Sequence, residues 1–596
     1  MNRLRLSVLA AIVMLVPVTG LKSAPAPAAQ SGLEQLPASA HMVIYLRGVQ
    51  GTRDRFVTMM ENALPEVLKK IQGTMDDFLT DGVDGRKLRG LPKDGPIFLV
   101  FTELPDPMAQ VEVPKFALVF AVTDYKEFRD NILTEGERNK LTDKGDGIEA
   151  TNIKNETETT YFLNRKGYAV VTPNEEVAKS FTKKQTGLHT QMSKEHAAKM
   201  LAADGAIYVN MEAIYKQYGD QIKLGKENYK QVIAQLEQAA TDESQKKLFK
   251  MFSKAIEPVF QAVEDLRATL VTLEFRPTGL ALHVQGELRD NTPTASLLED
   301  SRPVAFKELD RLPAGSALYT GMKTSAALFQ GLGTLMASNV LAQFGSDAKG
   351  VAEAMEALGK AGPSLRVDGF SFPMRGLQVY QYDEPVKAVE AQLKMFKAIA
   401  DADPKELGFK QKPTIKMNAE TFGEFKLHSV AISLDYDNLA EKVGQAGEAF
   451  KKPYAEYMKQ MLGEKTMTWF GTDGKTVVQV TASDWESARK ILEDFRKGKN
   501  TTGSDKAYLE ARKGMPTRTS FLGLFDLLNM YGTVIDALKP MLPPGRIPAN
   551  LQVKGKTAYI GLAVTLQPKR GSFDLFVTAS AARELYNAVV KPFVGE

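Results

Sequence analysis

The sequence predicts an α+β protein made of two related domains, in which helices pack on antiparallel sheets. Short apolar strands are joined by glycine-containing turns, and long helical stretches separate them without a regular β–α alternation. The same series of elements occurs twice along the chain. The length of 596 residues also exceeds what a single hydrophobic core supports.

The first 28 residues have the organisation of a secretory signal peptide. Arg3 and Arg5 form a basic start, an apolar stretch runs from Leu6 to about Val18, and small residues follow. The apolar stretch is shorter than the ~20 residues that a membrane-spanning helix needs, which favours cleavage over an uncleaved anchor. Cleavage after Ala28 would give a mature chain without a transmembrane helix.

Composition limits where the protein works and what it binds. The chain contains no cysteine, so disulfides, thiolate metal sites and a lipidated cysteine are excluded. Its 76 Lys and Arg residues nearly balance 72 Asp and Glu residues, which is not the charge surplus of a nucleic-acid-binding protein. We expect an exported protein, periplasmic or extracellular in a bacterium, without a lipid anchor and without a nucleic-acid partner.

The predicted domains are residues 29–290 and 312–596, with an exposed connector at 291–311 that is rich in Pro, Thr, Ser and Asp. Six pairs of segments follow one another in the same order in both domains, which predicts a tandem duplication. The pairs are 36–45 with 312–319, 96–101 with 370–372, 116–132 with a strand ending at Asp383 and the helix 385–396, 160–174 with 467–483, 205–219 with 519–532, and the strands joined at 276–279 with those joined at 568–571. A strand–helix block near 413–465 is expected to be an insertion.

A Leu-Pro-Ala motif before a short strand, present twice in an exported chain, resembles a set of extracytoplasmic bacterial proteins without assigned activity. The residues that carry this resemblance are Leu36, Pro37, Ala38, Tyr45, Leu312, Pro313, Ala314 and Tyr319. The resemblance implies an exported location and a plan of two duplicated α+β halves. It implies no activity and no functional residue.

Motifs for catalysis and for phosphate or metal binding are incomplete. The segment 471–476 contains Gly-Lys-Thr, but it lacks the first glycine of a P-loop and lies between two strands, which favours a hairpin turn. His189 and His196 could share a helix face, yet two histidines without cysteine make a poor zinc site. We therefore expect no catalytic residue, no metal site and no cofactor.

One segment between Lys323 and Asp347 carries no charge and has an apolar stripe at helical spacing. The stripe consists of Leu328, Leu332, Leu335, Met336, Val340 and Phe344. A helix buried in the fold is the favoured interpretation, and the alternatives are the wall of an apolar ligand cavity or a surface for a partner or a membrane. The segment 521–538 is similarly apolar.

These observations predict a soluble exported protein with a non-catalytic role, either binding or structural, in the cell envelope. Its partner would be an unidentified protein or another envelope component. A carrier of a hydrophobic small molecule is one alternative, and a hydrolase without a recognisable motif is another. A cavity of several hundred Å³ would favour the carrier, whereas clustered carboxylates, serines or a histidine in a polar cleft would favour the enzyme.

Overall fold

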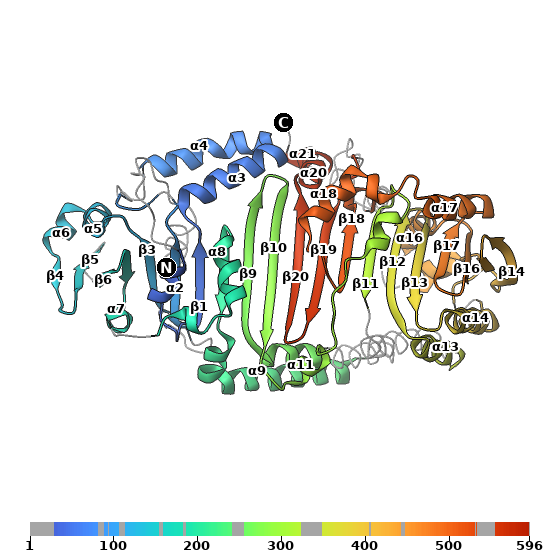
Figure 1. Ribbon diagram of the computed structural model, residues 1–596, viewed down its shortest axis with the longest axis horizontal. Helices are drawn as coiled ribbons and strands as arrows, with labels where there is room; N and C mark the ends of the chain where they lie inside the picture. Colours follow the sequence, from blue (N-terminus) through green and yellow to red (C-terminus); the bar gives the residue numbers. More distant parts are fainter. Residues whose placement is uncertain are drawn as a thin grey trace. The chain divides into compact units, whose positions relative to one another are not determined.

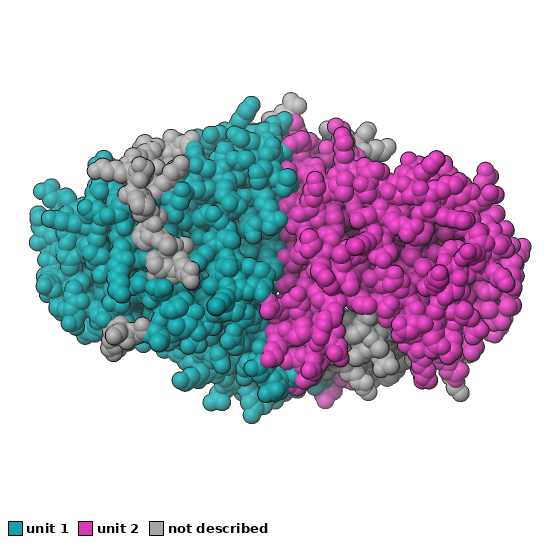
Figure 2. Space-filling model, in the orientation of Figure 1, with its two compact units in different colours: residues 1–234, 260–292 teal, residues 235–259, 293–596 magenta. Residues whose placement is uncertain are grey.

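The computed structural model describes residues 29–81, 89–92, 94–105, 114–153, 159–182, 186–240, 256–323, 349–404, 407–442, 448–530, 532 and 555–594. The predicted signal peptide lies outside them. The chain divides into unit 1, residues 1–234 and 260–292, and unit 2, residues 235–259 and 293–596 (Figure 2). The main division, between Thr292 and Pro293, falls within the predicted connector.

In the described part of unit 1, ten strands form an antiparallel sheet in the order β4-β5-β6-β7-β3-β2-β1-β8-β9-β10 (Figure 1). The strands are β1 (Met42–Leu46), β2 (Ile97–Glu103), β3 (Lys115–Ala121), β4 (Thr142–Asp143), β5 (Ile148–Asn152), β6 (Thr159–Arg165), β7 (Tyr168–Thr172), β8 (Gly205–Val209), β9 (Leu266–Arg276) and β10 (Gly279–Leu288). Helices accompany this sheet, and the predicted α+β class is confirmed.

The described strands of unit 2 follow the same order, β14-β15-β16-β17-β13-β12-β11-β18-β19-β20, and all neighbours are antiparallel. They are β11 (Leu318–Lys323), β12 (Pro363–Ser371), β13 (Arg375–Tyr382), β14 (Thr414–Phe422), β15 (Phe425–Ile432), β16 (Thr466–Thr472), β17 (Val477–Ala482), β18 (Phe521–Phe525), β19 (Ile560–Gln567) and β20 (Arg570–Thr578). Each strand of unit 1 therefore has a counterpart at the same position in the sheet of unit 2.

The two Leu-Pro-Ala motifs make the same backbone hydrogen bonds in the two units. Leu36 O accepts from Leu188 N at 2.9 Å, and Leu312 O accepts from Thr502 N at 2.9 Å. In each unit the motif is thereby joined to a short 3-10 turn that precedes a helix. These turns and helices are η1 (Leu188–Thr190) before α8 (Lys194–Ala202), and η4 (Thr502–Ser504) before α18 (Lys506–Gly514).

A second matched contact fixes which residues of β1 and β11 are equivalent. The carbonyl of His41 accepts from Asn210 N, and the carbonyl of Ala317 accepts from Asp526 N, each at 2.8 Å. Two residues further along, Tyr319 therefore occupies the position of Val43. The tyrosines that the sequence pairs, Tyr45 and Tyr319, are thus two residues out of register.

In unit 1, helices cover both faces of the sheet. The helices α2 (Ala29–Gln35), α7 (Glu175–Thr182) and α8 bury one face, where Val43, Phe98 and Leu270 are fully enclosed. On the other face, α5 (Tyr125–Ile132) packs on β2 and β3, while α3 (Val49–Ala63) and α4 (Pro65–Asp81) pack against the β9–β10 turn. The long helix α9 (Met211–Ala239) follows β8.

Unit 2 places its helices similarly. The helices α17 (Trp485–Lys497) and α18 pack on one face of the sheet, and α13 (Lys349–Lys360) and α14 (Pro385–Asp401) pack on the other over β13, β16 and β17. The strands β14 and β15 occupy the sheet positions of β4 and β5. Among the described elements of the predicted insertion, α15 (Tyr436–Lys442) and α16 (Glu448–Leu462) lack a counterpart in unit 1, because few residues separate β5 from β6 along the chain.

Candidate functional site

The apolar stripe that the sequence singles out, from Leu328 to Phe344, lies outside the described residues. Of the second apolar segment the structure describes residues 521–530 and 532, which form β18 and the start of the following helical turn. Along the described residues, none of the helices combines the length and the hydropathy needed to cross a membrane.

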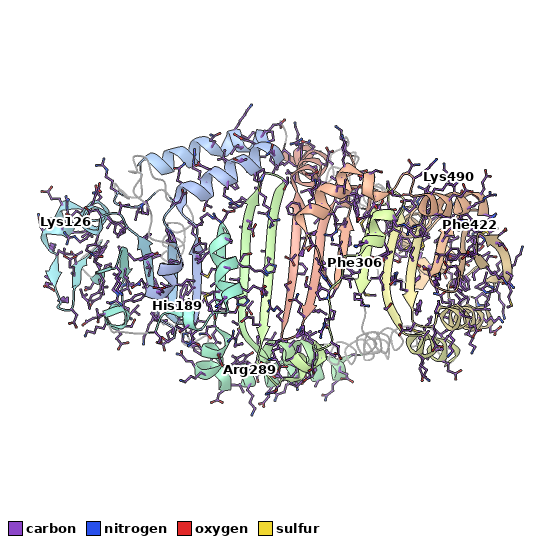
Figure 3. All side chains as sticks on the ribbon, viewed as in Figure 1. Lys126, His189, Arg289, Phe306, Phe422 and Lys490 are labelled. Atoms are coloured by element: carbon purple, nitrogen blue, oxygen red, sulfur yellow. The ribbon has the colours of Figure 1, made fainter. Side chains whose placement is uncertain are left out.

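The two histidines that could have shared a helix face do not lie on one helix. His189 is exposed in η1 (Figure 3), whereas His196 lies in α8 and is fully buried. No group of three or more His, Asp or Glu side chains among the described residues is placed to hold a metal ion. The Gly-Lys-Thr segment joins β16 to β17 as a hairpin turn, in which Asp473 Oδ1 accepts from Thr476 N at 2.7 Å, as the sequence predicts.

An open cavity of about 460 Å³ lies beside the β12–β13 turn in unit 2. It is lined by Phe372, Pro373, Glu456, Lys459, Gln460, Gly463 and Glu464. Lys459 Nζ and Glu464 Oε1 form an ion pair of 2.6 Å at this cavity. The lining comes from neither of the two apolar segments of the sequence, and its charged side chains do not suit a hydrophobic ligand.

A partly exposed apolar surface covers one face of β18, β19 and β20. We call it apolar face 2, and it consists of Phe521, Phe525, Leu562, Val564, Phe573 and Leu575. The strand register places these side chains directly opposite one another, because Phe521 pairs with Val564 and Val564 pairs with Phe573. All six are partly buried. The result is a continuous apolar patch across three strands.

The equivalent face of unit 1 has the same character. Apolar face 1 consists of Ile207, Val209, Val271, Leu273, Leu282 and Val284 on β8, β9 and β10. Ile207 is 37% exposed, and the other five side chains are partly buried. Among the described side chains, those of α3 and α4 contact this face at its turn end, where they meet Phe275 and Leu280.

The opposite face of the same strands is sealed by helices. In unit 2, Gly514 of α18 lies so close to β20 that a Cβ atom there would be 2.0 Å from the ring of Phe576. Phe306, which is 2% exposed, lies against Gly321 of β11 (Figure 3). In unit 1, α8 covers the corresponding face, where Tyr208 and Leu270 are buried. Each unit therefore has one closed and one accessible apolar face.

A polar cluster lies beside apolar face 2, on β11, β12 and β13. We call it the Arg366 cluster, and it consists of Thr320, Arg366, Asp368, Gln378 and Tyr380. Arg366 Nε donates to both carboxylate oxygens of Asp368 at 2.9 Å, and the ring of Tyr380 lies 5.5 Å from the guanidinium. Burial opposes the charge of Arg366, but Tyr380 and Asp368 outweigh it and raise the guanidinium pKa. This arginine is charged at any physiological pH.

A second polar cluster in unit 1 is enclosed between α8 and the sheet. Glu287 accepts from Arg267 at 2.7 Å and lies 3.7 Å from His196 Nε2. Burial lowers the pKa of His196 to about 4, so the imidazole is neutral at pH 7. Because His196 is fully buried, this cluster contributes to folding and does not present a reactive group to a substrate.

Comparison of the chain with protein-family models, with curated protein sequences and with solved structures found no match. The geometry of the two units is therefore the basis for assigning a role. The apolar segment 521–538 of the sequence contributes Phe521 and Phe525 to apolar face 2, whereas no sequence motif marks the other residues of the two faces or the Arg366 cluster. Their signal in the sequence is a strand that is apolar on both of its faces, as in residues 560–566.

Proposed function

We propose that the protein is an exported, non-catalytic binding protein of the bacterial cell envelope that carries a hydrophobic ligand on its apolar faces. The observation that carries this proposal is that the same side of the sheet is apolar and partly exposed in both units, while the other side is closed by helices. Contiguous apolar surface on a soluble domain is a mark of a binding site.

The two faces resemble each other although their side chains differ. Val271 and Leu562 occupy equivalent positions, as do Val284 and Leu575. None of these positions carries a charged residue, although a charge on a partly exposed strand face would protect the sheet from aggregation. An apolar ligand would gain burial on either face without a change in the strands.

The cell-envelope location is supported by the basic, apolar and small-residue regions at the N-terminus. The non-catalytic role is supported by the polar groups that the structure describes. His196 is enclosed, and His41 Nδ1 is engaged with the carbonyl of Thr102 at 2.5 Å. These arrangements suit structural roles and not proton transfer to a substrate.

The proposal is tested with the uncharged fluorescent probe N-phenyl-1-naphthylamine and with native mass spectrometry of the exported protein. We expect the wild type to retain a small apolar molecule and to bind the probe. Leu575→Asn and Val284→Asn place an amide on apolar face 2 and apolar face 1, so the double variant should bind the probe about tenfold more weakly. Thr278→Asn, in the exposed β9–β10 turn, is the matched control.

The proposal is wrong if the wild type retains no ligand and binds no probe while it remains folded. That result would favour the role of a structural or interaction protein, in which the apolar faces contact another protein. A complex in the native mass spectrum would then identify such a partner.

We also infer that the two units arose by tandem duplication of one ancestral unit. The shared strand order and the matched backbone bonds of the Leu-Pro-Ala motifs support this inference. A shared origin explains why the apolar faces occupy the same side of each sheet. Relatives that contain one unit alone would support the duplication, and a relative that shares one strand order but not the other would argue against it.

A further inference from the structure

The Arg366 cluster occupies sheet positions that are apolar in unit 1. Thr320 pairs with Asp368, and Asp368 pairs with Gln378 on the next strand; Arg366 pairs with Tyr380. Each residue of the cluster has an apolar counterpart in unit 1. Thr320 corresponds to Ile44, Arg366 to Ile97, Asp368 to Leu99, Gln378 to Leu118 and Tyr380 to Phe120. Ile97, Leu118 and Phe120 belong to a hydrophobic cluster there. The sheet is thus compatible with apolar side chains at all five positions.

This difference between the units argues that the polar cluster is not required for folding. Removing an ion pair from water costs free energy that its mutual attraction repays only in part. The carboxylate of Asp368 is 4% exposed, so unit 2 bears the cost of removing this charge from water. Unit 1 avoids that cost because its residues at the same sheet positions are apolar. A function of the charged group accounts for its presence better than stability does.

The geometry leaves one side of the Arg366 guanidinium available to a ligand. Its Nε is used by Asp368, which also accepts from Thr320 Oγ1 at 2.7 Å and is thereby held in place. No further hydrogen bond of this guanidinium is found within the described part of the chain, and the side chain is 38% exposed. Two terminal nitrogens in a fixed plane match the two oxygens of a carboxylate or phosphate.

An apolar path leads from this guanidinium across the sheet. On the strand next to Arg366, Met322 is its direct partner, and Phe521, Val564 and Phe573 follow on the next three strands in the same row. Four strand spacings make this path about 19 Å long. The charge therefore lies at one end of a row that continues into apolar face 2.

We propose that unit 2 binds a single-chain anionic amphiphile, with its carboxylate or phosphate head on Arg366 and its alkyl chain on apolar face 2. The proposal rests on the proposed function and names the ligand class for one of the two faces. Asp368 and Thr320 are positioning residues, because they hold the guanidinium and do not touch the ligand. Apolar face 1 has no such charge at the equivalent place, so it binds an uncharged ligand as well as an anionic one.

The test compares 11-(dansylamino)undecanoic acid with its methyl ester on the full mature chain. We expect the wild type to bind the acid about tenfold more tightly than the ester, since a charge-assisted hydrogen bond is lost with the ester. The double variant Arg366→Ile, Asp368→Leu carries the residues of unit 1 and removes the ion pair without leaving a buried charge. It should bind the acid and the ester equally.

Arg375→Met is the matched control, because this arginine is exposed on the same β12–β13 hairpin and lies outside the row. Displacement of the probe by laurate, dodecyl phosphate and dodecanol distinguishes the head groups. Stronger displacement by either anion than by dodecanol supports the proposal and says which head group fits.

Two results separate the proposals. If the wild type binds acid and ester equally, or the folded double variant keeps the preference for the acid, Arg366 is not the head-group site, while the hydrophobic-ligand function stands. If the wild type binds neither probe and also fails to bind N-phenyl-1-naphthylamine, both proposals are wrong.

Discussion

At the scale of residues, one buried histidine makes the stability of unit 1 depend on pH. His196 of α8 is fully buried, and neither of its ring nitrogens has a hydrogen-bond partner in the described part of the chain. It faces Glu287 and the cations Lys199 and Arg267, and its ring contacts Tyr208. Burial is the largest influence on this imidazole and keeps it neutral, which makes the folded state of unit 1 sensitive to acid.

We predict that His196 makes the protein less stable as the pH falls from about 6.5 to 4. In this window the unfolded chain binds a proton that the folded chain does not, because the pKa of His196 is lowered to about 4 by burial. Between pH 7 and pH 5 the loss should be about 2 kcal/mol. The lowered pKa of Glu287 adds a loss of the same sign at still lower pH.

Urea unfolding of the wild type and His196→Phe at both pH values measures this effect. The variant should lose less stability between pH 7 and pH 5 than the wild type, even if it is less stable at pH 7. Equal losses in the two proteins would show that His196 titrates normally in the folded state.

At the scale of elements, the approach of α18 to the sheet depends on a glycine. A Cβ atom at Gly514 would overlap the ring of Phe576, and Met515 lies similarly close to Gly561 of β19. The helix therefore packs directly on the strand backbone, which closes this face and leaves apolar face 2 as the accessible side.

Gly514→Ala should destabilise unit 2 by about 1–3 kcal/mol, because the new Cβ atom would lie 2.0 Å from the ring of Phe576, which is 1% exposed. Gly136→Ala in α6 (Glu135–Asn139) is the control, since nothing lies within 4 Å of a Cβ atom there. That change should be neutral or slightly stabilising. Chemical denaturation measures both, and equal stability of the two variants would contradict the close approach.

At the scale of the whole molecule, the N-terminal pattern predicts the cellular setting. We predict that the chain is exported and cleaved, so that N-terminal sequencing of the protein from an expressing bacterium begins near Ala29. Recovery of intact Met1 from the cytoplasmic fraction would contradict export and, with it, the envelope setting of the proposed function.

The sequence by itself predicts much of the fold. Alternating apolar residues, turn glycines and the Leu-Pro-Ala motifs predict the α+β class and the order of elements, because these signals are local in the chain. The sequence signal is weaker for the two strands that begin the predicted insertion. The strands β14 and β15 have weak counterparts in the short β4 and β5, whose equivalence depends on sheet position and not on residue pattern.

The sequence by itself excludes cysteine chemistry and predicts a two-part plan and an export signal, because each is read from composition or from neighbouring residues. Only the tertiary structure decided which face of each sheet is accessible and which residues form the Arg366 cluster. Both depend on strand pairing and on helix packing between residues far apart in the chain. A row such as Arg366, Met322 and Phe521 has no pattern along the sequence, since it runs across three strands.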